Sequence, residues 1–207
     1  MDVEALEPDQ VVGAFIRKHD IHLPMNLLRR IPGIPRPQPV WLTALMSQRH
    51  CFDHNALKYL DKLEHPMRKT MLDYYEAKKS QPLWYVAASF GDARPIVHTK
   101  AVRWMKRGLR EALLERGYDR EGRKVVTGGG GASVRDMYGT IKVQCSDAKA
   151  LCKLEWPGVF ALMKKVLAAA EVQLKRDHIG KHILPTPVVN NRPYQKKKTG
   201  GNWTRRS

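Results

Sequence analysis

Acidic residues are scarce in this sequence relative to basic ones. Among 207 residues, Asp and Glu number 20 against 37 Lys and Arg, which leaves a net charge of +17. Few chains of this size carry such an excess without a polyanionic partner, because self-repulsion destabilises the compact state and counterion release on nucleic acid compensates for it. Hydrophobic residues make up 43% of the chain, which is enough for a packed core and excludes a wholly disordered protein.

Long apolar runs and disulfide patterns are also missing. No run of about 18 apolar residues exists, so no membrane span is expected. The three cysteines, Cys51, Cys145 and Cys152, are odd in number and lack the spacing of a disulfide framework. A reducing intracellular compartment is the expectation, either the mitochondrial matrix or the cytoplasm. Residues 1–10 are acidic and resemble neither a secretory signal nor an Arg-rich transit peptide.

The usual motifs of hydrolytic and nucleotide-binding enzymes are absent. There is no Gly-x-Ser-x-Gly, and the glycine run 128–131 is not followed by the Gly-Lys-Ser/Thr of a phosphate-binding loop. A metal-dependent nuclease would need convergent carboxylates. Five acidic residues lie in predicted loops near strand ends and could converge: Asp92, Asp119, Glu121, Asp136 and Asp147. A turn or cap role is enough to explain Asp92, Asp119 and Asp147. We expect no catalytic residue and no cofactor, with a nuclease as the alternative.

Two groups of histidine and cysteine invite a metal-site interpretation. The first is His50, Cys51 and His54, where no second cysteine pairs with Cys51. The second group combines residues from the predicted core and the tail: Cys145, Cys152, His178 and His182. Six residues separate its cysteines, which exceeds the usual spacing of structural zinc ligands. We expect no metal at either place, because a free cysteine is often a small buried hydrophobe.

The central region 83–176 predicts an α+β domain. Residues 83–90 and 95–99 are expected to be strands joined by a turn at Gly91 and Asp92, followed by a helix from Lys100 that ends before Gly117. Residues 137–145 alternate as a half-buried strand, and 156–176 have the pattern of an amphipathic helix. The β-β-α-β-α order predicts a small mixed or antiparallel sheet with helices on one face.

The helix after Thr99 has two distinct faces. Its apolar face packs on the sheet in this prediction. The adjacent face is a row of five cations at helical spacing: Lys100, Arg103, Lys106, Arg107 and Arg110. Such a row can simply be a helix face exposed to solvent. The net charge of the whole chain instead favours phosphate groups as the partner of these five cations.

Four extensions surround this predicted domain. We expect an N-terminal helix in 1–23, a proline-rich extended spacer in 24–39 and a helical arm in 40–80, and within the domain itself a mobile glycine-rich loop at 127–133. The fourth extension is the C-terminal tail. The tail 177–207 is predicted to be disordered and basic. Its cations are interspersed with aromatics, a composition that can track a phosphate backbone and stack on bases: Arg192, Tyr194, Lys196, Lys197, Lys198, Trp203, Arg205 and Arg206.

In its general build the chain resembles ribosomal and other ribonucleoprotein components, which combine a small α+β core with an arm, a spacer and a cationic tail. No motif carries this likeness to individual residues. It implies a non-catalytic protein that binds RNA, with rRNA as the expected partner, while the arm and spacer bind neighbouring proteins. The further alternatives are a nucleic-acid-processing enzyme and a DNA-packaging or viral nucleoprotein.

Overall fold

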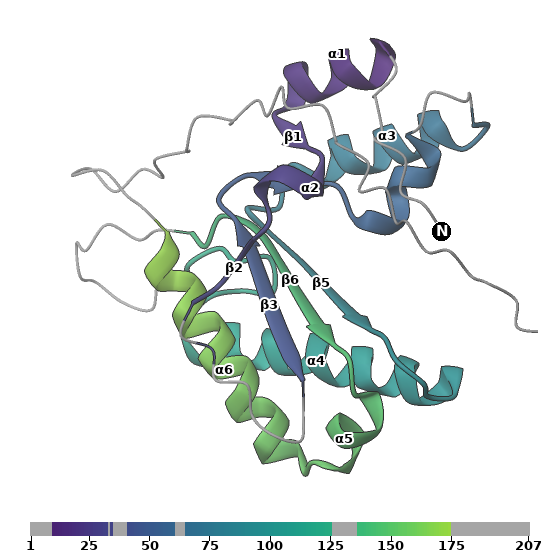
Figure 1. Cartoon of the computed structure of the whole chain (residues 1–207). Helices are drawn as coiled ribbons and strands as arrows, with labels where there is room; N and C mark the ends of the chain where they lie inside the picture. Colours follow the sequence, from purple (N-terminus) through teal and green to yellow (C-terminus); the bar gives the residue numbers. More distant parts are fainter. Residues whose placement is uncertain (1–9, 33, 35–40, 61–64, 126–135, 175–207) are drawn as a thin grey trace, which may run out of the picture.

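A mixed four-stranded sheet with helices packed on one face forms the centre of the molecule (Figure 1). The computed structural model describes residues 10–32, 34, 41–60, 65–125 and 136–174. The strand order across the sheet is β2 (Arg29–Arg30), β3 (Leu42–Ser47), β6 (Gly139–Cys145) and β5 (Leu83–Ser89). Because β6 runs antiparallel to β3 and parallel to β5, the sheet is mixed. In the described structure β2 lies at one edge of the sheet and β5 at the other.

Three helices pack against the sheet; the first comes after β5 in the sequence, and the other two come after β6. Parallel strands need a crossover connection, and α4 (Pro95–Glu115) supplies it between β5 and β6. After β6 come α5 (Ala148–Lys153) and α6 (Trp156–Gln173). The carboxylate of Asp147 caps α5 by accepting a hydrogen bond of 2.8 Å from the backbone N–H of Ala150.

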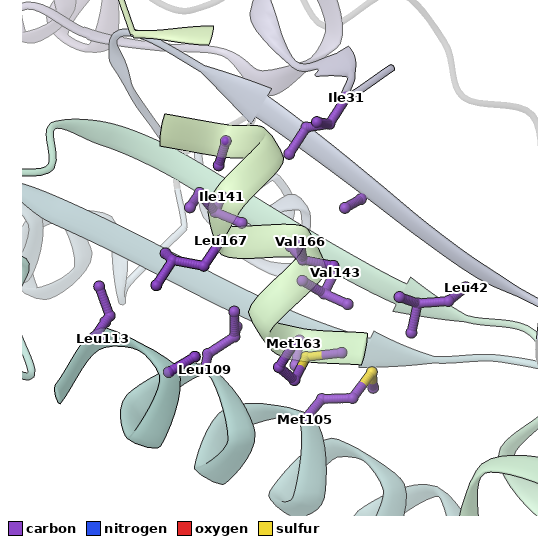
Figure 2. Packing of buried hydrophobic residues seen from close by; sticks show 14 of the residues in the cluster. Ile31, Leu42, Met105, Leu109, Leu113, Ile141, Val143, Met163, Val166 and Leu167 are labelled. Atoms are coloured by element: carbon purple, nitrogen blue, oxygen red, sulfur yellow. The ribbon is translucent and has the colours of Figure 1, made fainter. Parts of the chain in front are cut away.

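The main core lies between these helices and the sheet. Alternate residues of β3 and β6 face inward in register, with Ala44 opposite Val143 and Met46 opposite Ile141. Figure 2 shows the apolar side chains that meet this face from α4 and α6: Met105, Leu109, Leu113, Met163, Val166 and Leu167. All six are at most 1% exposed, so the two helices are held to the sheet by burial of their apolar stripes.

Close approach of α4 and α6 depends on Gly108. A Cβ at this position would lie 2.7 Å from Cγ of Met163, which is closer than real Cβ atoms come to a neighbour. The glycine therefore lets the two helices pack in direct contact, and this contact fixes the orientation of the opposite, solvent-facing side of α4.

A second, smaller core lies at one end of the sheet. Its elements come from the N-terminal part of the chain: α1 (Gln10–His19), β1 (Ile21–His22), β4 (His50–Cys51), the 3-10 helix η1 (His54–Tyr59) and α3 (Arg68–Lys78). The short strands β1 and β4 pair in parallel. Trp84 of β5 is 1% exposed and belongs to this cluster, so it joins the second core to the sheet.

The expected mixture of helix and sheet is confirmed, and several elements are confirmed individually. The strands expected at 83–90 and 137–145 correspond to β5 and β6, and the helix expected from 156 is α6. The strand expected at 95–99 is wrong, because these residues are the first turns of α4. Pro95 occupies the first helical position after an extended Arg94. His98 ties this helix start to the end of β5 through Ser89 Oγ at 3.0 Å and the carbonyl of Gly91 at 3.2 Å.

The helical arm expected in 40–80 is wrong at its start. Residues 42–47 form β3 inside the sheet, with Leu42, Ala44 and Met46 buried against the helices. Helix is present only later, as η1 and α3, with a 3-10 helix at 54–59 where an α-helix was expected.

The proline-rich segment departs from the purely extended spacer that the sequence predicts. It begins with a helical turn, α2 (Pro24–Leu27), and continues into β2. Pro24 lies at the start of that turn, where a missing N–H costs nothing. The glycine-rich loop 127–133 and the tail 177–207 lie outside the described residues.

Candidate nucleic-acid interface

The five cations predicted on one face of the central helix do lie on the outer side of α4. We call Lys100, Arg103, Lys106, Arg107 and Arg110 the α4 cationic face. Lys106 is half-buried and the other four are exposed. The opposite stripe of α4 is buried in the main core, so packing on the sheet directs these charges outward.

Carboxylates neutralise little of this face. Arg107 donates a hydrogen bond of 2.7 Å from Nε to Glu111 Oε1, one turn further along the helix. The other four cations form no ion pair with a carboxylate among the described residues. Since an exposed pair contributes little, even Arg107 remains available to a stronger anion.

Aromatic rings border one side of the α4 cationic face. The ammonium of Lys100 lies 4.9 Å from the ring centre of Trp104, and the guanidinium of Arg107 lies 4.4 Å from that of Trp156 on α6. Trp104 and Trp156 contact each other edge to face, with ring centres 6.2 Å apart, and both are half-buried. Cations and rings in this arrangement suit a surface that meets both phosphates and bases.

A basic cavity of about 340 Å³ lies on the other side, beside the edge strand β5. Lys106 and Arg110 reach it from α4, Lys78 from the end of α3, and Arg120 from the turn that follows α4. The remaining lining residues form its walls: Gln81, Leu83, Trp84, Tyr85 and Glu121. The structure thus brings two of the predicted cations together with two that the sequence did not single out.

The electrostatics of the basic cavity are strongly positive. Four cations face one carboxylate, Glu121, and that carboxylate already accepts hydrogen bonds from Arg123 and from Gln81 Nε2. Burial lowers the pKa of Lys78 from its ordinary value; the carboxylate of Asp53 acts in the opposite direction, and the nearby ammonium of Lys106 adds to the lowering. An anion in the cavity would offset the burial of Lys78 and its repulsion by Lys106.

The eight predicted residues of the tail, from Arg192 to Arg206, lie outside the described residues. Their expected cooperation with the α4 cationic face therefore stays a prediction. Within the described residues, no helix has both the length and the apolar character needed to cross a membrane.

The first candidate metal group is engaged in packing. His50 is 1% exposed, bonds the carbonyl of Pro82 through Nε2 at 3.0 Å, and stacks on Trp84 with ring centres 4.3 Å apart. Burial lowers the pKa of His50 to about 4 and raises the pKa of the Cys51 thiol to about 11, while His54 is exposed.

The second candidate group is only partly described. Burial raises the pKa of both Cys145 and Cys152, and His178 and His182 lie outside the described residues. In the part of the chain that the structure describes, no three His, Cys, Asp or Glu side chains are grouped to hold a metal ion.

The loop carboxylates mostly serve their own turns. Asp119 accepts hydrogen bonds from the backbone N–H groups of Glu121 and Arg123 at 2.8 and 2.7 Å, as its predicted turn role requires. Asp136 accepts one from the N–H of Lys124 at 2.9 Å, and Asp147 caps α5. These bonds give each of the three carboxylates a structural role.

Comparison of the chain with protein-family models, with curated proteins and with solved structures finds no match in any of the three. The interface is therefore interpreted from its own residues. The sequence pattern identified the α4 cationic face but missed Lys78, Arg120 and the aromatic border. One signal in the sequence could have indicated the cavity. Lys106 and Arg110 lie one helical turn apart at the edge of the cationic face, where their side chains can meet residues of a neighbouring element.

Proposed function

We propose that this chain is a non-catalytic RNA-binding component of a large ribonucleoprotein, with the ribosome as the favoured assembly and rRNA phosphates as the principal contact. The α4 cationic face and the tail cations from Arg192 to Arg206 would make these contacts together. The proline-rich segment and the N-terminal elements would bind neighbouring proteins.

One observation carries this proposal. Four of the five cations on α4 have no carboxylate partner among the described residues, although the helix is anchored firmly on its other side. A row of uncompensated charges on a rigid helix is costly unless a polyanion meets it. The aromatic rings of Trp104 and Trp156 beside the row favour RNA with accessible bases over duplex DNA.

The test uses the substitutions Lys100→Gln and Arg103→Gln together. Both side chains are exposed and neither forms an ion pair with a described carboxylate. Binding of the full chain to a folded RNA would be measured across a salt series. Each lost phosphate contact should lower the slope of log affinity against log salt by about 0.7 to 0.9, so the double variant should lose about 1.5.

The matched control is Arg17→Gln with Lys69→Gln, which removes the same charge from α1 and α3. Both side chains are exposed and form no ion pair with a described residue. The control should change the slope little, and both variants should melt within a few degrees of the parent because exposed substitutions cost about 0.5 kcal/mol or less. Equal slopes for the parent and the α4 variant would contradict the proposed interface, as would an equal loss in the control.

Removal of residues 195–207 tests the contribution of the tail. The truncated chain should bind RNA more weakly than the parent and keep its melting temperature. A large fall in melting temperature would show that these residues belong to the folded core.

A further inference from the structure

We propose that the basic cavity beside β5 binds a phosphate monoester, and that in the RNA-bound protein this is the terminal phosphate of an RNA strand. The assignment of the ligand to an RNA end rests on the proposed function. The preference for a phosphate monoester rests on the cavity alone.

The walls of the cavity are fixed by hydrogen bonds between three segments of the chain. The indole N–H of Trp84 donates to the carbonyls of Lys78 and Gln81 at 3.0 and 3.1 Å, which holds the end of α3 against β5. The backbone N–H of Leu83 donates to the carbonyl of Glu121 at 3.0 Å, which holds the 119–122 turn to the same strand. Lys78 and Arg120 are therefore carried into the cavity by anchored backbone.

Donors of several kinds converge on the cavity. Lys78 and Lys106 present ammonium groups, and Arg110 and Arg120 present guanidinium groups, which can bind phosphate oxygens in pairs. Tyr85 Oη accepts a hydrogen bond of 3.1 Å from Arg110 Nε. That bond orients the phenol and leaves its own proton available to a phosphate oxygen.

The charge balance favours a terminal phosphate over an internal one. Four cations against one carboxylate leave a surplus of three positive charges at the lining. An internal phosphodiester carries one negative charge, whereas a monoester carries about 1.5 to 2 at neutral pH. A volume of about 340 Å³ is also at the small end for ligand pockets and suits one phosphorylated group with its sugar.

The experiment compares three forms of one single-stranded RNA of about ten nucleotides, a length within the usual range of single-strand sites. The forms carry a 5′-phosphate, a 3′-phosphate or hydroxyl groups at both ends, and each is titrated against the full chain. We expect a phosphorylated end to improve affinity about tenfold, which corresponds to about 1.4 kcal/mol. Adenosine monophosphate serves as a competitor that supplies the same chemistry from a free nucleotide.

The cavity variant is Lys106→Gln with Arg120→Gln. Its two side chains come from different elements and form no ion pair with a described carboxylate. It should bind all three RNAs equally. The matched control is the Lys100→Gln, Arg103→Gln variant, which removes the same charge outside the cavity. The control should bind every RNA more weakly and still prefer the phosphorylated end.

The outcomes separate this inference from the proposed function. Equal affinity of the parent chain for all three RNAs would overturn the cavity site and leave RNA binding intact. A preference that persists in the cavity variant would overturn it too. Binding of adenosine monophosphate that depends on Lys106 and Arg120, with no binding of any RNA, would support the phosphate site and overturn the proposed function. Failure to bind RNA or nucleotide would overturn both.

Discussion

Acidification should destabilise the protein through His50, and the structure sets the size of the effect. The imidazole is 1% exposed and lies between Trp84 and Tyr138, with ring centres 4.3 and 4.7 Å away. Its Nε2 carries the proton that is donated to the carbonyl of Pro82, and its Nδ1 is buried with no hydrogen-bond partner in the described structure. Protonation of Nδ1 would therefore place an unpaired N–H and a full charge in an aromatic environment.

The magnitude follows from proton linkage. Burial lowers the pKa of His50 from its ordinary value of 6.5 to about 4. Between these two values the unfolded chain binds a proton that the folded chain does not, so the stabilising contribution is complete above pH 6.5 and is lost as the pH falls toward 4. The full difference is about 3 kcal/mol, and about 2 kcal/mol of it is lost by pH 5.

The assay is urea unfolding of the parent and of His50→Phe from pH 7 to pH 4. Phenylalanine keeps the aromatic stacking and cannot titrate, and the carbonyl of Pro82 still accepts the N–H of Gly139 at 3.0 Å. The variant should lose about 1 kcal/mol at pH 7 from the missing hydrogen bond. Its free energy of unfolding should then decline less steeply, so that it becomes the more stable protein near pH 5.

Other titrating groups contribute equally to both proteins, and the difference between the two pH curves isolates His50. Parallel curves would refute the reasoning, because they would mean that the ring is protonated in the folded protein at no cost. A parent-minus-variant difference in the free energy of unfolding that shrinks as the pH rises from 5 to 7 would refute the sign of the linkage.

Two further predictions concern packing. Gly108→Ala should destabilise the fold by about 1 to 3 kcal/mol, because the new methyl overlaps Met163, and adding Met163→Ala should relieve that overlap; additive losses in thermal unfolding would contradict the helix contact. Cys51 should resist alkylation at pH 8 in the folded protein and react on unfolding, because burial raises the pKa of its thiol to about 11; mass spectrometry showing rapid native labelling at Cys51 would contradict its burial.

Part of the fold was predictable because its pattern is local. The alternation along 137–145 predicted the strand that is observed as β6, and the apolar stripe from Phe160 to Leu174 predicted the helix that is observed as α6. The mistaken strand at 95–99 arose because Pro95 was interpreted as the start or edge of a strand, whereas it occupies the first turn of α4. Ile96 is in fact 75% exposed, so no buried strand environment exists there.

The strand at 42–47 was harder to recognise. Its outward residue Leu45 is apolar, so the segment lacks the polar alternation of a half-exposed strand, and its sequence pattern predicts the start of a helix instead. Its place in the sheet is decided by pairing with β6, almost a hundred residues away in sequence, and no local pattern contains that information.

The candidate site divides in the same way. Periodicity alone placed the α4 cationic face, because one helix carries all five residues. The basic cavity needs α3, β5, α4 and the 119–122 turn together, so Lys78 and Arg120 become neighbours of Lys106 only after folding. A site assembled from several elements leaves no spacing in the sequence by which to find it.

The edge strand β5 connects the main core to the second core, and it lies beside both the α4 cationic face and the basic cavity. Successive residues of a strand face opposite ways, so Trp84 enters the second core while Tyr85 faces α4. The indole of Trp84 holds the end of α3, and through it Lys78, at the cavity that Tyr85 and Arg110 line from the other side. The sheet and α4 by themselves would present a basic helix surface, but they would lack one wall of the cavity and one of its two ammonium groups, that of Lys78. Under the two proposals, the N-terminal elements would do more than contact neighbouring proteins: they would complete a concave site for a phosphate monoester beside the α4 cationic face that is proposed to bind RNA.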